Sequence, residues 1–205
     1  KRGALLFFGQ AGCVSCHSVA GRSNEMFSDF QLHRIGGPQV FPQFGVGLGN
    51  VIFDGPGSNE DFGVEQTTGD PSLRYMFRTA PLRNLAVAPG YFHNGAFGSI
   101  KEAIEHHLDV LHSATHYNPE KNGLPRDLSV GPIEPVLAAG IDPLLAEPIH
   151  LNGGQLEDLV AFVSQALLDE RVLDFCELVP ASVPSGLPVA QFQGCRDHEH
   201  DGDDN

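Results

Sequence analysis

Apolar residues recur at helical spacing in three stretches of the chain, and the sequence predicts a helix in each of them. The first helix covers residues 2–12 and ends at Gly12. The second begins at Ser99, because Ser99 and Glu102 have the spacing of a capping box. The third covers residues 155–168. The apolar faces consist of Ala4, Leu5, Phe8 and Ala11 in the first helix, Ile100, Ala103, Ile104, Leu108 and Leu111 in the second, and Leu156, Leu159, Val160, Val163 and Leu167 in the third.

The segments between these helices are rich in glycine and proline and keep no lasting periodicity. Residues 18–70 are mostly irregular, apart from a weak helical pattern over residues 26–32, and residues 112–153 are again rich in loops. Residues 72–80 indicate a short helix or turn that runs into Pro81. A long irregular segment in a compact domain commonly wraps a ligand. The apolar contacts expected from it are Phe27, Phe30, Phe41, Phe44 and Phe53.

The sequence Cys-Val-Ser-Cys-His at residues 13–17 is the attachment pattern of a c-type haem. Cys13 and Cys16 would each bond one haem vinyl group, and His17 would be the first axial ligand of the iron. A zinc half-site or a thioredoxin-like dithiol is the alternative. The other two cysteines form no second close ligand pair, and no βαβ alternation surrounds the motif. We therefore expect a mainly α, cytochrome c-like haem domain with long irregular loops and one covalent haem c.

The second axial ligand decides whether such a haem transfers electrons or has an open position for catalysis. His107 lies in the middle of the apolar face of the second predicted helix, whereas His106 points about 120° away from it. We therefore prefer His107 as the second ligand. Met26 follows His17 too closely to reach the other haem face easily. The alternatives left open are Met76, His106, His93 and an open coordination position.

Arginines near the middle of the chain are candidates to bind the anionic haem propionates, because a guanidinium fork matches a carboxylate. Arg78 and Arg83 are the preferred candidates in a chain that is short of cations. For Arg74 we prefer an ordinary surface position.

The formal net charge of −14 argues against nucleic acid as a partner and suits a basic redox protein. No apolar run is long enough to span a membrane. Residues 196–205 hold five acids and one base and should form a disordered tail. Its histidines, His198 and His200, would bind metal weakly at most.

The chain begins at Lys1 without a methionine, which is typical of a processed or partial product. Covalent haem of this type is attached outside the bacterial cytoplasm, so we expect a periplasmic or otherwise extracytoplasmic protein. That compartment permits a Cys176–Cys195 disulfide, whose loop of about 20 residues would add roughly 3 kcal/mol. The expected organisation is a haem domain over residues 1–175, an extended Pro-rich segment over residues 176–195, and the tail.

The order of these features resembles the C-terminal haem domain of the bacterial di-haem cytochrome c peroxidase family, which includes the MauG-type enzymes. The resemblance covers about residues 2–168 and is most specific between Phe77 and Gly95. The matching stretches are residues 2–8 ahead of the Cys-Val-Ser-Cys-His motif, 27–36, 61–63, 68–70, 77–84, 91–95 and 156–162.

The resemblance implies roles for particular residues. The family's second ligand to this haem, a methionine in typical peroxidases and a tyrosine in MauG, falls on His107. A bis-histidine haem generally has a lower potential than a His/Met haem. His93 matches a family histidine near the haem and the domain interface, where it could bond a propionate. The family's interdomain calcium would contact the carbonyls of Ala88 and Gly90, which leaves calcium as an option.

The chain departs from the family in having one haem-attachment motif, without the N-terminal domain that carries the peroxidatic haem. Peroxidase activity therefore does not carry over. We expect an electron-transfer domain that works with a redox protein or an adjacent haem domain. The alternatives are part of a peroxide-reducing or MauG-like oxidoreductase that needs the missing domain, and a structural haem subunit of a larger complex.

Overall fold

The computed structural model describes residues 1–21, 25–42, 60–174, 176 and 179–189. The chain divides into two compact units, Lys1–Leu168 and Asp169–Asn205. In the second unit, the described residues contain one short 3-10 helix, η7 (Glu170–Leu173). The candidate site lies wholly in the first unit.

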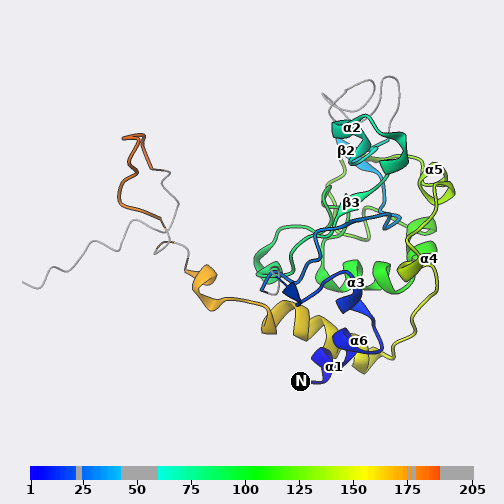
Figure 1. The fold of residues 1–205 in the computed structure, drawn as a ribbon, viewed down its shortest axis with the longest axis horizontal. Coiled ribbons are helices and arrows are strands. Elements are labelled where there is room, and N and C mark those ends of the chain that lie inside the picture. The colour runs from blue at the N-terminus through cyan, green and yellow to red at the C-terminus, as the bar shows by residue number, and fades with distance from the viewer. Residues whose placement is uncertain (22–24, 43–59, 175, 177–178, 190–205) are drawn as a thin grey trace, which may run out of the picture. The chain divides into compact units, whose positions relative to one another are not determined.

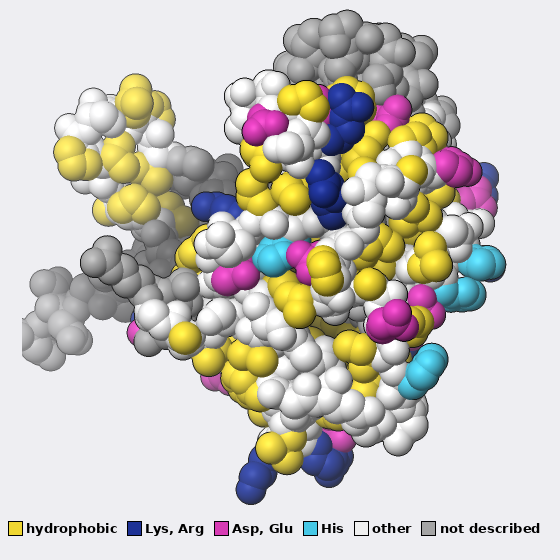
Figure 2. Space-filling model, turned by 45° about the vertical axis from the view of Figure 1, so that its right-hand side comes forward, with side chains coloured by type: hydrophobic (Ala, Val, Ile, Leu, Met, Phe, Trp, Pro, Cys, Tyr) yellow, Lys and Arg dark blue, Asp and Glu magenta, His cyan; other side chains and the backbone are white. Residues whose placement is uncertain are grey.

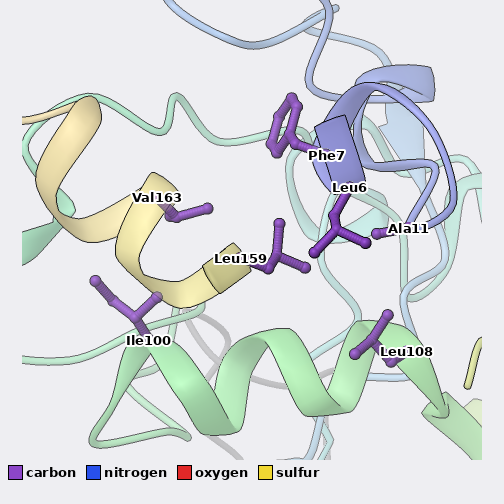
Figure 3. Packing of buried hydrophobic residues seen from close by; sticks show 7 residues of the cluster. All are labelled: Leu6, Phe7, Ala11, Ile100, Leu108, Leu159 and Val163. Atoms are coloured by element: carbon purple, nitrogen blue, oxygen red, sulfur yellow. The ribbon is translucent and has the colours of Figure 1, made fainter. Parts of the chain in front are cut away.

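Three helices form the base of the first unit: α1 (Arg2–Phe8), α3 (Ile100–Leu108) and α6 (Gly153–Ala161). Helix α6 packs against both α1 and α3, so segments from the two ends and the middle of this unit meet (Figure 1). Their apolar side chains converge between the helices (Figure 3). This core consists of Leu6, Phe7, Ala11, Ile100, Leu108, Leu159 and Val163.

Helix α6 confirms the third predicted helix and most of its apolar face. Leu159, Val163 and Leu167 are 0%, 5% and 3% exposed. The helix begins earlier than predicted, at Gly153, because Asn152 and Gln155 form a reciprocal capping box. Its continuation, η6 (Phe162–Ala166), is a π-helix, a form that often occurs beside functional sites.

Helix α1 is shorter than predicted, and most of its predicted apolar face is wrong, although Ala11 is buried as predicted. It ends at Phe8, and Leu5 and Phe8 are 69% and 45% exposed while Leu6 and Phe7 are buried. Most of this helix is apolar, so the periodicity alone does not choose a face. Gly3 determines which face of α1 packs against α6. A Cβ at Gly3 would overlap the backbone of Asp158, so the missing side chain lets the two helices approach closely.

Helix α3 begins where predicted, with the Ser99 hydroxyl accepting a hydrogen bond from the Glu102 N–H at 3.2 Å. Helix α3 ends at Leu108 and so does not reach Leu111, the last residue of the predicted apolar face. Asp109 is extended (φ −151°) and caps a new helix, α4 (Val110–Thr115), through the His112 N–H. This break turns Leu111 outward, where it is 57% exposed, so its place on the predicted face is wrong.

The rest of the first unit consists of short elements between long loops, as expected. Two antiparallel strand pairs, which the sequence analysis missed, join distant segments: β1 (Leu32–His33) with β3 (Phe77–Arg78), and β2 (Val40–Pro42) with β4 (Leu128–Val130). The other short helices among the described residues are η1 (Cys13–Ser15), α2 (Glu65–Thr68), η3 (Pro71–Leu73), η4 (Leu85–Val87), α5 (Glu134–Ala138) and η5 (Pro143–Leu145).

Other sequence-based expectations have mixed outcomes. Residues 26–32 form turns and the start of a strand, so the helix suggested there is wrong. Phe27 packs against the core, whereas Phe30 is 36% exposed. The side chains of Phe41, Phe44 and Phe53 lie outside the described residues, as do the tail and Cys195; Cys176 is disulfide-bonded. Within the described ranges, the helices are too short or too polar to cross a bilayer.

Candidate haem site

The Cys-Val-Ser-Cys-His loop leaves the end of α1 through a tight turn. Gly12 adopts a left-handed conformation (φ 65°), and the single turn η1 follows, with the His17 N–H bonded to the Cys13 carbonyl at 2.9 Å. Cys13 and Cys16 are half-buried and are not bonded to each other. Burial raises the pKa of each thiol to about 11. Both sulfurs are therefore neutral thiols at physiological pH.

His17 is oriented by the segment that follows the loop. Its Nδ1 donates to the Phe27 carbonyl at 3.0 Å, which leaves Nε2 as the nitrogen suited to a metal. Burial lowers the pKa of His17 to about 4, and the nearby His107 ring adds to this effect. The imidazole is thus neutral at physiological pH, which is the form that binds a metal.

His107 presents the same arrangement from helix α3. Its Nδ1 donates to the Ala103 carbonyl one turn earlier at 2.7 Å. The Phe92 ring lies parallel to the imidazole, with centroids 5.3 Å apart and an interplanar angle of 11°. Burial lowers the pKa of His107 as well. The His107 imidazole is therefore also neutral. The hydrogen bond to Ala103 holds one edge of the ring, and Phe92 packs against one face.

The His17 and His107 rings lie close together, in a tilted, edge-on arrangement. Their centroids are 6.5 Å apart, and the ring planes are inclined by 64°. A metal–imidazole bond of about 2 Å on each side, plus the distance from nitrogen to ring centre, puts two such rings roughly 6 Å apart. The observed separation therefore fits one iron atom between these two histidines, with the Cys13 and Cys16 thiols alongside to hold a porphyrin.

His106 has a different role from its neighbour. It is 0% exposed, and both of its ring nitrogens are hydrogen-bonded, Nδ1 to the Ser113 hydroxyl at 3.0 Å and Nε2 to the Ile35 carbonyl at 2.8 Å. No ring nitrogen is left for a metal, which argues against His106 as the alternative ligand. Helical spacing placed it off the apolar face, yet it is buried, because the loops on that side of α3 form a second packed surface.

Two residues beside the histidines have strained backbones. Phe27, whose carbonyl holds His17, has φ 55°, and Phe92, whose ring stacks on His107, has φ 64°. A bulky residue in the left-handed region costs roughly 1–3 kcal/mol and is commonly retained at functional sites. Packing offsets this cost at Phe27, since its ring lies 5.8 Å from that of Phe7 and 6.5 Å from that of Phe162.

The other candidate residues lie in distinct environments. His93 is bonded through Nε2 to Asp61 at 2.8 Å and stacks on Phe77, with ring centroids 3.9 Å apart. Arg78 is exposed, with its guanidinium 5.1 Å from the centre of the Phe30 ring, and Arg83 is exposed. Binding of these three side chains to propionates stays a prediction.

Arg74 has the surface role that was expected from the sequence, because it forms a bidentate ion pair with Glu65 at 2.5 and 2.8 Å.

Of the two methionines, Met26 is 41% exposed and Met76 is half-buried. The backbone N–H of Met76 bonds to Leu73, and its carbonyl accepts from Val64. Calcium at the Ala88 and Gly90 carbonyls also stays a prediction.

One polar network beside the Cys-Val-Ser-Cys-His loop was not predicted from the sequence. The His33 ring lies between two carboxylates, with Nδ1 2.6 Å from Asp142 and Nε2 3.2 Å from Asp29, and the Cys16 sulfur lies 4.0 Å from Nδ1. Asp142 is more than 100 residues from His33 in the chain, so no local spacing points to the contact. Among the described residues, this is where three potential metal-ligating groups, Cys16, Asp29 and His33, come together.

No family model matches the chain, but individual proteins do. The cytochrome-c peroxidase IdrP1 of Pseudomonas sp. (strain SCT) is 26% identical over 182 residues, which is 84% of this chain and 41% of that protein. The methylamine utilization protein MauG of Paracoccus denitrificans is 30% identical over 172 residues, 78% of this chain and 40% of that protein. The chain thus spans about two fifths of these relatives.

Solved structures give the same result for the fold. A MauG-like protein associated with microbial copper homeostasis superposes with a TM-score of 0.51 at 22% identity, covering 84% of this chain and 47% of that one. The di-haem peroxidase BthA from Burkholderia thailandensis gives a TM-score of 0.50 at 19% identity, covering 93% of this chain and 46% of that one.

The fold of the first unit is of the type found in MauG-like and di-haem peroxidase structures. The chain is a homologue of the di-haem cytochrome c peroxidase and MauG family, and it corresponds to part of such a protein. A c-type haem is the cofactor that this relationship implies.

Proposed function

We propose that this chain is a c-type cytochrome domain that transfers electrons through one covalently bound, bis-histidine haem. The observation that carries the proposal is the closeness of His17 and His107, whose ring centroids lie 6.5 Å apart. The Cys13 and Cys16 sulfurs would hold the porphyrin, and the two imidazoles would occupy both axial positions. When bound, the haem would supply a reversible one-electron couple of the iron.

The residues of this chain suit electron transfer better than chemistry at the iron. With both His17 and His107 holding the iron, the haem would have no coordination position left for a substrate. Each ligand is held by a backbone carbonyl, Phe27 for His17 and Ala103 for His107, so neither ring is free to turn away. A rigid ligand set also keeps the structural change between oxidation states small. A His/His pair further favours a lower potential than a His/Met pair.

The proposed location and redox partner of the protein follow from the haem and from the net charge of the chain. Covalent attachment of haem to a Cys-Val-Ser-Cys-His motif supports an extracytoplasmic, periplasmic location. The net charge of −14 supports a basic redox protein as the partner, and a neighbouring haem domain is the other candidate. Exposed apolar side chains occur on the surface among the polar ones (Figure 2) and would suit such contacts.

A second function, part of a peroxide-reducing enzyme, is favoured by the names of the relatives, several of which are called cytochrome-c peroxidases. In that case the chain would supply the electron-collecting half of a longer protein. The two functions share the same haem site and differ in whether a further haem domain is needed.

Spectroelectrochemical titration combined with a peroxide assay tests the proposal on the purified haem-loaded chain. We expect one reversible one-electron transition, rapid exchange of electrons with small cytochromes, and no turnover of hydrogen peroxide above that of the buffer with free haem. Peroxide turnover by this chain alone, at rates typical of an enzyme, would overturn the electron-carrier assignment.

A further inference from the structure

Helix α4 carries His112, and His116 is the residue that caps its C-terminal end; the haem site uses neither histidine. His112 and His116 are exposed, and their rings stack with centroids 4.4 Å apart and an interplanar angle of 27°. Histidine side chains are visible on the surface in Figure 2. From this pair we infer a second metal site, a two-histidine surface site for a divalent transition metal that favours imidazole, namely Cu²⁺, Ni²⁺ or Zn²⁺.

The spacing of the pair suits chelation. Residues four apart on a helix lie one above the other on the same face, and two histidines at this spacing are an established way to bind one metal ion. The His116 N–H still bonds to the His112 carbonyl at 3.1 Å, so the helical turn between them is complete. The His112 side chain is exposed, so its ring has room to turn toward the His116 ring.

The backbone beneath the pair is fixed on both sides. Val110 and Ala114, on the opposite face of α4, are 1% and 4% exposed and anchor the helix to the domain. At the start of α4, the Asp109 carboxylate caps the helix by accepting from the His112 N–H at 3.1 Å. The two ligands are therefore presented by a preorganised turn, which lowers the entropy lost on binding.

The hydrogen bonds of His116 select the nitrogen that would bind. Its Nδ1 lies 2.9 Å from the His112 carbonyl and 3.0 Å from the Thr115 hydroxyl. Because a carbonyl only accepts, Nδ1 carries the proton and Nε2 keeps the lone pair that a metal needs. This is the same arrangement, imidazole on a backbone carbonyl, that fixes both histidines of the haem site.

The chemistry of the two ligands sets the order of preference among metals. Two imidazoles with water in the remaining positions should bind Cu²⁺ most tightly, with Ni²⁺ and Zn²⁺ weaker, following the Irving–Williams order. The acidic charge of the chain raises the local concentration of cations of any kind, so it supports affinity and not selectivity.

Isothermal titration of the haem-loaded full chain with Cu²⁺ and with Ni²⁺ at pH 7.5 tests this site. We expect one site of highest affinity, at least tenfold weaker in either His112→Asn or His116→Asn because a chelate becomes a single ligand. The matched control is His150→Asn, an exposed histidine of the same unit, which should leave the dissociation constant unchanged. Haem absorbance and far-ultraviolet circular dichroism establish that each variant is folded.

The two tail histidines are the main competitors, so the double variant His198→Asn/His200→Asn is titrated as well. Retention of the tight site in this variant supports the assignment to α4. Loss of the tight site in the tail variant, or an unchanged dissociation constant in His112→Asn and His116→Asn, would overturn it. None of these substitutions touches the haem ligands, so the outcome is independent of the proposed electron-transfer function.

Discussion

The His17 and His107 rings lie with their centroids 6.5 Å apart, and each ring donates through Nδ1 to a backbone carbonyl. His17 comes from the loop after α1, and His107 comes from the last turn of α3. The pairing is therefore a tertiary feature that depends on how α1 and α3 meet at α6.

Exchange of one ligand should shift the redox potential in a known direction. In His107→Met, a thioether that favours reduced iron replaces an imidazole, so we expect the midpoint potential to rise by on the order of 100 mV. Potentiometric titration of both proteins measures the shift. The comparison variant is His106→Gln, which keeps a buried hydrogen-bonding side chain and should leave the potential close to that of the unaltered chain.

The close contact of α1 with α6 predicts that a methyl group added at Gly3 destabilises the folded protein, whereas one added at Gly153 does not. Gly3→Ala forces a Cβ against the Asp158 carbonyl, so we expect a loss of about 2–4 kcal/mol in the free energy of unfolding. Gly153→Ala is the matched control, because a Cβ there meets nothing within 4 Å, and it should be neutral or slightly stabilising. Urea denaturation of both variants decides the point; equal stabilities would contradict the described packing.

Removal of the buried His106 should destabilise the domain without altering the haem ligands. His106→Phe fills a similar volume but leaves the Ser113 hydroxyl and the Ile35 carbonyl without their partner. We expect a cost of roughly 2–4 kcal/mol in thermal or urea unfolding, with an unchanged low-spin haem spectrum. A spectrum that became high-spin would instead make His106 a ligand.

The His33 network predicts a pH-dependent contribution to stability. Burial lowers the pKa of His33, but the hydrogen bonds to Asp142 and Asp29 outweigh burial, so the pKa is raised above its usual value. The folded state therefore binds more protons than the unfolded one above about pH 6.5. The stabilisation is complete below that pH and is lost as the pH rises through the folded pKa.

Urea unfolding between pH 6 and pH 9 measures this contribution. The unaltered chain should lose stability relative to His33→Asn as the pH rises, so that the difference between them shrinks. His150→Asn, an exposed position, should follow the unaltered chain throughout. A difference that stays constant across this range would mean that His33 does not titrate in the folded protein.

Local patterns in the sequence located the three helices and the Cys-Val-Ser-Cys-His motif, because each depends on neighbours in the chain. The same patterns favoured His107 as the second ligand, which stays a prediction. The face of α1 could not be predicted, since Leu5, Leu6, Phe7 and Phe8 are all apolar and only contact with α6 distinguishes them. The break at Asp109 was also missed, because an extended residue inside an apolar repeat leaves the repeat itself unchanged.

Long-range polar contacts lay beyond prediction from one sequence. The β2–β4 pair joins segments nearly 90 residues apart, and the contact of His33 with Asp142 depends on the turn η5. The burial of His106 follows from loops that pack on the side of α3 away from α6. In each case a contact between distant segments determines the surroundings of the side chain, and the local sequence pattern does not indicate that contact.

Electron paramagnetic resonance of the ferric haem-loaded chain tests the central claim most directly, in the unaltered protein and in His107→Ala. With His17 and His107 as the two axial ligands, the unaltered chain gives a wholly low-spin signal. Loss of one strong-field ligand then converts most of the iron to high spin in His107→Ala. A low-spin signal that persists unchanged in His107→Ala would contradict the assignment of His107 as a ligand.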